Sequence, residues 1–164
     1  MKRAFTLIEL LLYVSLAAFL LLSISTLLML VLRAKIKNQA IAEVYHQGNM
    51  VMSHIAQSAR SARQIQLPAT STVGTTLTLA AFEPSSDPTV YDISSDVIRF
   101  TKGAATPLPL TSSRVVAHGL AFQNLSRSGT SGTVRIEFTL THVNPEGRNE
   151  YEFSKTFYGS ATIK

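Results

Sequence analysis

Residues 10–32 read LLLYVSLAAFLLLSISTLLMLVL, 23 consecutive uncharged residues without glycine or proline in a chain of 164. At about 1.5 Å per residue they would form a helix of roughly 34 Å, which is long enough to span a bilayer. A secretory signal peptide has a shorter apolar region followed by a small-residue cleavage site. Here Arg33-Ala-Lys-Ile-Lys37 follows the apolar run instead. We therefore expect an uncleaved membrane helix.

The helical pattern continues beyond the apolar run, through residues 33–66. Apolar residues recur at spacings of three, four and seven, which is typical of one buried face of an amphipathic helix. They are Ile41, Val44, Val51, Ile55, Ala59 and Ala62, and Gly48 fills the gap between the second and the third. Leu67-Pro68 would end the helix, because the residue before proline disfavours helical backbone angles. The pattern predicts one helix from about residue 5 to residue 66, ~90 Å long.

After Pro68 the apolar period changes to two, which predicts short strands at 75–79 and 96–100 and a less regular one at 114–122. The clearest pair is 133–141 with 150–157, separated by the turn residues Asn144-Pro-Glu-Gly147. One face of this hairpin would carry apolar side chains and rest on the helical stripe between Ile41 and Ile65. Those side chains are Val134, Ile136, Phe138 and Leu140 on the first strand and Tyr151, Phe153 and Phe157 on the second. The predicted fold is α+β: a long N-terminal helix, half transmembrane and half amphipathic, packed on a small antiparallel sheet at 67–164.

Composition and motif spacing argue against an enzyme. The chain has no cysteine, which excludes disulfides, thiolate zinc sites and a cysteine nucleophile. The four histidines His46, His54, His118 and His142 are not at metal-ligand spacing, and Asp87, Asp92 and Asp96 do not match a calcium-binding loop. No metalloprotease, serine hydrolase or phosphate-loop motif occurs. We expect no catalytic residue, metal or cofactor.

Charge is also unevenly distributed. The net charge of +5 lies mainly in residues 33–66, whereas residues 67–164 carry equal numbers of acidic and basic side chains. A neutral C-terminal part disfavours nucleic acid as a partner, since nucleic-acid binding usually needs a broad basic surface.

The N-terminal residues Lys2-Arg3-Ala4-Phe5-Thr6-Leu7-Ile8-Glu9-Leu10-Leu11 contain a carboxylate with apolar residues on both sides. A carboxylate within hydrocarbon costs on the order of 3 kcal/mol at the helix centre and less near its edge. This segment resembles the N-terminus of type IV pilin-like proteins, the family of pilins and secretion-system pseudopilins. The resemblance implies cleavage by a prepilin peptidase between Ala4 and Phe5, N-methylation of Phe5, and packing of the apolar helices into a filament core. Residues 1–4 would be a leader peptide, and residues 5–32 the membrane and filament-core helix.

In such a filament, Glu9 of one subunit could neutralise the new Phe5 amine of its neighbour, because two charges that are costly alone become tolerable when paired. Two departures from the family pattern are present. Ala4 stands where the family usually has glycine, which bears on the efficiency of processing. The apolar helix also lacks the glycine and proline common in major pilins, which resembles minor pilins and pseudopilins.

The predicted function is therefore a minor pilin or pseudopilin of a type IV pilus-like filament. Its expected partners are other pilin subunits, prepilin peptidase and the bacterial cytoplasmic membrane, with the N-terminus inside before assembly and a cell-surface or periplasmic filament afterwards. One alternative is a membrane-anchored binding or adhesion domain that never polymerises. Another is a DNA-uptake filament subunit that retains DNA through Arg60, Arg63 or Arg127.

Overall fold

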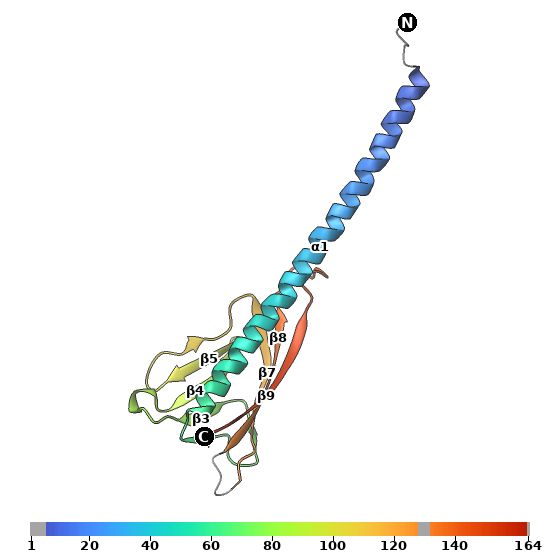
Figure 1. Cartoon of the computed structure of the whole chain (residues 1–164). Helices are drawn as coiled ribbons and strands as arrows, with labels where there is room; N and C mark the ends of the chain where they lie inside the picture. The colour runs from blue at the N-terminus through green and yellow to red at the C-terminus, as the bar shows by residue number, and fades with distance from the viewer. Residues whose placement is uncertain (1–5, 128–131, 164) are drawn as a thin grey trace.

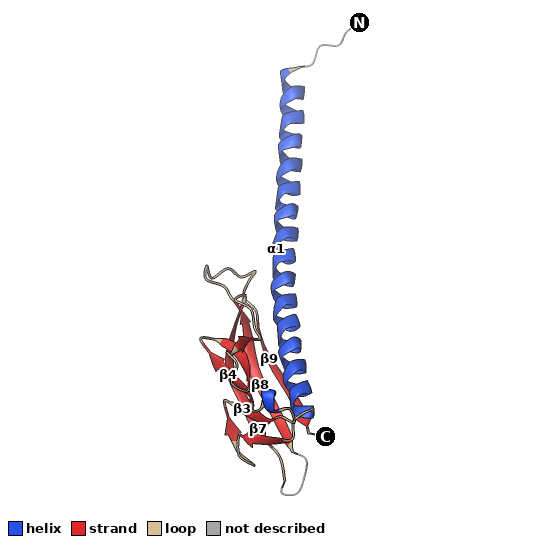
Figure 2. Cartoon of the chain, turned by 90° about the vertical axis from the view of Figure 1, so that its left-hand side faces the viewer, coloured by secondary structure: helices blue, strands red, loops and turns tan. Residues whose placement is uncertain are grey.

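One long helix dominates the computed structural model, which describes residues 6–127 and 132–163 (Figure 1). Helix α1 spans Leu7–Arg60, and its first half projects away from the rest of the chain in both views (Figures 1 and 2). Its second half lies along a head made of strands. The strands are β1 (Gln64–Leu67), β2 (Val73–Gly74), β3 (Leu77–Ala80), β4 (Thr89–Ser94), β5 (Val97–Lys102), β6 (Leu108–Pro109), β7 (Val115–Asn124), β8 (Thr133–His142) and β9 (Ser154–Thr162), with a short 3-10 helix at Pro84–Ser86.

The predicted α+β arrangement of a long helix on antiparallel strands is confirmed, but the strands form two sheets where one was predicted. The five-stranded sheet has the order β1-β3-β4-β5-β6, and the four-stranded sheet has the order β2-β7-β8-β9. All the strand pairs are antiparallel. The sequence pattern missed the division because periodicity identifies strands but does not say which strands pair.

The helix ends at Arg60, six residues before the predicted end. The Ser61 N–H donates to the Gln57 carbonyl at 3.2 Å, and the Arg63 N–H then donates to the Ala80 carbonyl at 2.7 Å. This second bond begins the pairing of β1 with β3. Tertiary strand pairing therefore ends the helix before Pro68 would do so.

The helical stripe predicted from spacing is the buried face of α1. Val44, Gly48, Val51, Ile55 and Ala59 are buried, as is Ala62 just after the helix. Ile41 is half-buried at the edge of the stripe. This face contacts both sheets: the Phe157 ring of β9 lies against Gly48, and the Tyr91 hydroxyl of β4 bonds to Ser58.

The predicted C-terminal hairpin is present as β8 and β9, with Phe138 opposite Phe157. Its first strand lies where the pattern placed it. Its second strand begins at Ser154, four residues later than predicted, so Tyr151 and Phe153 precede it. The ring of Tyr151 stacks on His142 and that of Phe153 on Tyr45, at centroid distances of 5.5 and 5.9 Å. The Phe153 carbonyl still accepts a hydrogen bond from the His142 N–H at 2.9 Å, so the two segments approach each other just before β9 begins.

Candidate functional site

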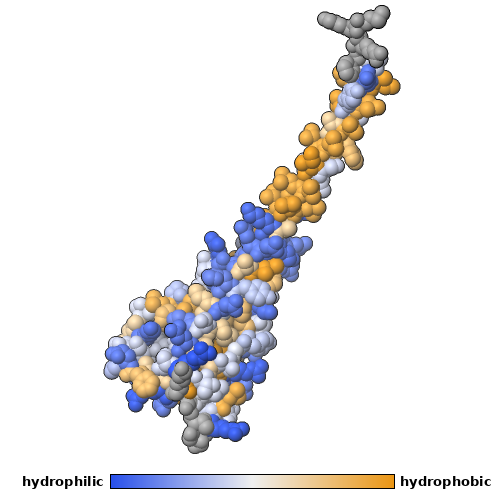
Figure 3. Space-filling view, viewed as in Figure 1, coloured by the Kyte–Doolittle hydropathy of each residue, from blue (hydrophilic) through white to orange (hydrophobic). Residues whose placement is uncertain are grey.

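The most unusual surface of the molecule is the first half of α1, from Leu7 to Leu32. Its large apolar side chains are 50–83% exposed, and the space-filling view shows a largely apolar rod beyond the head (Figure 3). Soluble monomers rarely expose apolar patches larger than a few hundred Å². By length and composition the helix could cross a membrane. Among residues 6–127 and 132–163, nothing covers this apolar half.

The hydroxyl groups within the apolar half are suited to apolar surroundings. The Ser15 hydroxyl donates to the Leu12 carbonyl at 2.8 Å, and the Ser23 hydroxyl donates to the Phe19 carbonyl at 2.9 Å. The hydroxyl of Thr26 bonds one turn back in the same way. Such bonds satisfy polar groups without outside partners, so these residues do not interrupt an apolar interface.

Glu9 is the one acidic residue of this half and lies in the first turn of α1. Its backbone N–H donates to the Thr6 carbonyl at 3.1 Å, and its side chain points outward, exposed. A carboxylate at this position is favoured by the positive end of the helix dipole. Among residues 6–127 and 132–163, Glu9 takes part in none of the ion pairs. Ala4 and Phe5, the predicted cleavage and methylation residues, lie outside the described residues.

The apolar half ends at a set of charged contacts between α1 and the loop that joins β8 to β9. Arg33 Nε lies 3.5 Å from Glu150 Oε1, and Arg148 Nε lies 3.7 Å from Glu150 Oε2. The Glu150 side chain is 17% exposed, so the helix and the loop shield it from solvent. Lys35 and Lys37 are exposed on the same segment of helix. The boundary between apolar and polar surface therefore falls within one residue, between Leu32 and Arg33.

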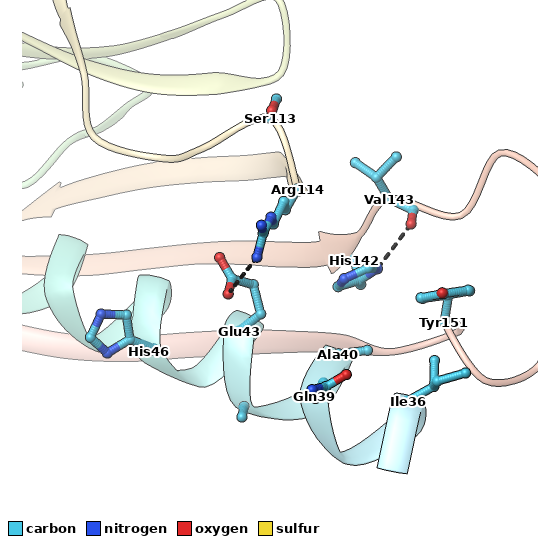
Figure 4. Close-up of a pocket in the computed structure, with 11 residues that line it drawn as sticks. Ile36, Gln39, Ala40, Glu43, His46, Ser113, Arg114, His142, Val143 and Tyr151 are labelled. Atoms are coloured by element: carbon cyan, nitrogen blue, oxygen red, sulfur yellow. Dashed lines mark hydrogen bonds and ion pairs between the residues drawn. The ribbon is translucent and has the colours of Figure 1, made fainter. Parts of the chain in front are cut away.

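A groove of about 710 Å³ lies between α1 and the head just beyond this boundary (Figure 4). It is lined by Ile36, Gln39, Ala40, Ala42, Glu43, His46, Ser113, Arg114, His142, Val143 and Tyr151. Arg114 Nη1 lies 3.8 Å from Glu43 Oε2, and His142 Nδ1 lies 2.9 Å from the Val143 carbonyl oxygen. In this groove the carboxylate of Glu43 is therefore paired with the guanidinium of Arg114.

Gln47 is a buried polar residue on the otherwise apolar stripe, 4% exposed. Its amide oxygen accepts a hydrogen bond from the Ser112 N–H at 2.8 Å, while its amide nitrogen donates to the Ser112 hydroxyl and to Glu43 Oε1. The amide thus ties the loop after β6 to the helix. Gln47 was not predicted from the sequence to be buried. Its place next to Gly48, on the apolar stripe, could have indicated a buried polar residue.

The residues considered as metal ligands are dispersed over the second half of α1 and the head. His54 Nδ1 lies 3.0 Å from the Tyr91 hydroxyl, and His118 Nε2 lies 3.0 Å from the Thr141 hydroxyl. Asp92 forms an ion pair with Arg99, and Asp87 accepts from the Ala81 N–H. In the part of the chain that the structure describes, no group of three or more histidine or acidic side chains could hold a metal ion.

Burial affects the ionisation of the contact between α1 and β4. It lowers the pKa of His54 below its usual 6.5, with the nearby Lys102 charge adding to the effect. It raises the pKa of Tyr91 to about 12, although the hydrogen bond to Ser58 opposes the rise. Both groups are therefore held neutral at ordinary pH and act as packing and hydrogen-bonding residues.

The chain matches no protein-family model, no curated protein and no solved structure. The class that the fold defines is an α+β head carried on a helix whose exposed apolar half could anchor in a membrane.

Proposed function

We propose that this chain is a structural subunit of a type IV pilus-like filament, as a minor pilin or pseudopilin. Before assembly it resides in the bacterial cytoplasmic membrane with its N-terminus inside, and afterwards in a cell-surface or periplasmic filament. The observation that supports this most is the division of α1: residues 7–32 are exposed and apolar, while the second half is buried against two sheets. The bilayer covers the apolar half first, and the helices of other subunits cover it next.

The shape of the chain would allow the apolar half to pass from contact with lipid to contact with the helices of other subunits. From Leu7 to Leu32 the helix extends about 39 Å, and the head lies wholly along its other half (Figure 2). Apolar halves of several subunits can therefore approach one another without collision between heads. A head placed beside the apolar half would prevent that packing.

Glu9 supplies the specific contact in this proposal. Prepilin peptidase would release an amine on Phe5, four residues before Glu9 in the sequence. A neighbour shifted along the axis by on the order of one turn, about 5.4 Å, would bring its Phe5 amine to this carboxylate. Pairing removes much of the cost of placing either charge in an apolar core. The pair would also fix the axial register of neighbouring helices.

Mass spectrometry of the membrane and filament fractions tests the processing step. A mature chain beginning with N-methyl-Phe5 supports the filament proposal, whereas an intact Met1 or a retained leader contradicts it. A membrane-anchored domain that never polymerises gives no subunit in the filament fraction at all.

The variant Glu9→Leu tests the pairing role. An unpaired amine in the apolar core costs on the order of 3 kcal/mol, so we expect filament incorporation to fall by about two orders of magnitude. The matched control is Glu146→Leu, which removes an exposed acid of the head and should assemble as the unmodified chain does. Equal membrane levels of both variants must be shown by immunoblot. Assembly of Glu9→Leu subunits at normal levels would show that the pairing role is wrong.

A further inference from the structure

Three basic residues follow the apolar half directly: Arg33, Lys35 and Lys37, here called the basic collar. No acidic residue occurs between Glu9 and Glu43, so this stretch of the helix carries positive charge alone. At about 100° per residue, Arg33 and Lys37 lie on one side of the helix and Lys35 lies opposite. All three residues are exposed, and the space-filling view shows a hydrophilic band where the apolar rod ends (Figure 3). The collar therefore presents cations on two opposite sides of the helix.

The contacts within the chain leave most of this charge uncompensated. Arg33 shares Glu150 with Arg148, so this acid is used by two bases. Among residues 6–127 and 132–163, neither Lys35 nor Lys37 forms an ion pair. The surface at this level accordingly suits an anionic partner.

The position of the collar along the helix identifies that partner. The apolar run from Leu10 to Leu32 is about 34 Å long, and a hydrocarbon core is about 30 Å thick. With Glu9 at one headgroup layer, Arg33 enters the opposite one. Lysine and arginine side chains at such a boundary extend their charged ends toward the lipid phosphates.

We propose that the basic collar binds the phosphate groups of anionic phospholipids in the leaflet where the helix leaves the bilayer. The inference rests on the membrane stage of the proposed function. These contacts hold the subunit at a fixed depth and are lost when it leaves the bilayer for a filament. The ligand is a bilayer headgroup, not free phosphate.

Native mass spectrometry of the full-length chain, released from nanodiscs of equal parts phosphatidylglycerol and phosphatidylcholine, tests the proposal. We expect the chain to retain phosphatidylglycerol preferentially, and Lys35→Gln/Lys37→Gln to reduce that preference by about fivefold for each charge removed. This double variant leaves the pair between Arg33 and Glu150 intact. The control Lys102→Gln/Arg135→Gln changes the net charge equally in the head and should retain the preference.

Several outcomes overturn the proposal: no lipid preference in the unmodified chain, the same preference in the collar variant, or the same loss in the control. Displacement of phosphatidylglycerol by millimolar inorganic phosphate also overturns it, since the collar would then be a free-phosphate site. Failure of the filament proposal gives a different result. If the chain selects anionic lipid but never yields a methylated Phe5, the lipid proposal stands and the filament proposal fails. If Phe5 is methylated but the chain shows no lipid preference, the filament proposal stands and the lipid proposal fails.

Discussion

Replacement of Gly48 by alanine should destabilise the head, although alanine favours helix formation. A Cβ built at Gly48 would lie 2.0 Å from Cζ of Phe157 and within 2.4 Å of both Cε atoms. The Phe157 ring is 7% exposed and stacks on Phe138 with a centroid distance of 5.3 Å. It also meets the Tyr45 ring edge-on at 6.3 Å. Contacts with these two rings therefore restrict how far the Phe157 ring can move.

Two effects of opposite sign set the magnitude. Overpacking a well-packed core costs about 1–3 kcal/mol, and an overlap this deep against a confined ring belongs at the upper end. Alanine in a helix interior gains about 1 kcal/mol over glycine. The expected result is a decrease of about 2 kcal/mol in the free energy of unfolding.

Denaturant unfolding of the full-length chain in mild detergent, followed by near-ultraviolet circular dichroism of the tyrosines, measures this change. The exposed neighbour Asn49→Ala is the control for helix propensity and should not destabilise the head. In a Phe157→Leu background the three colliding ring atoms are absent, so Gly48→Ala should become neutral or stabilising by up to about 1 kcal/mol. If Gly48→Ala in the natural background is as stable as the unmodified chain, the close approach of α1 to β9 is wrong.

Gln47 and His54 of α1 and Tyr91 of β4 are polar residues at the contact between the helix and the head. Gln47→Leu should lower the free energy of unfolding by about 1–3 kcal/mol, because the Ser112 N–H loses its acceptor; an unchanged denaturation midpoint would contradict the role of this amide. Because burial lowers the pKa of His54, the unfolded chain binds a proton more readily, so stability should be complete above pH 6.5 and fall as the pH decreases through the lowered pKa. In thermal melts below pH 6.5, His54→Gln should make the stability depend less steeply on pH. If the pH dependence is unchanged in this variant, another group causes it. Spectrophotometric titration at high pH, compared with that of Tyr91→Phe, should show Tyr91 ionising at about 12, and the head should lose stability as the pH rises from 10 through that value. Ionisation of Tyr91 at its ordinary pKa of 10 would contradict its burial.

The helix was the most predictable part of the fold, because its two halves carry two strong patterns. An uninterrupted apolar run identifies the first half, and apolar residues three and four apart identify the second. Its end was mispredicted because Ala59 and Ala62 keep helical spacing while β1 is already pairing with β3. Where the helix ends therefore depends on the pairing of β1 with β3. The local spacing of apolar residues does not reveal that pairing, because β3 lies further along the sequence.

The strands were predictable where polar and apolar residues alternate over several positions, as in β8. Strand β4 was missed, although Val90, Tyr91 and Ile93 lie opposite residues of β5 across a two-residue turn. In this turn Ser95 and Asp96 have φ values of 50° and 61°, which the tight turns favoured in hairpins require. An aspartate that tolerates this conformation was a usable signal. The two-residue strands β2 and β6 carry no such signal, because two positions cannot show a period.

For the candidate site, the sequence identified the apolar half and Glu9, whereas only the structure relates them to the head. Residues 7–60 form one uninterrupted helix, so the buried face that includes Gly48 fixes the rotation of the exposed half as well. The carboxylate of Glu9 therefore has a fixed direction relative to the head-facing side of the helix. A neighbour that pairs with Glu9 therefore approaches from a direction set by the packing of the head. In the proposed filament, the core contact made by one acid would determine how every head is oriented on the surface.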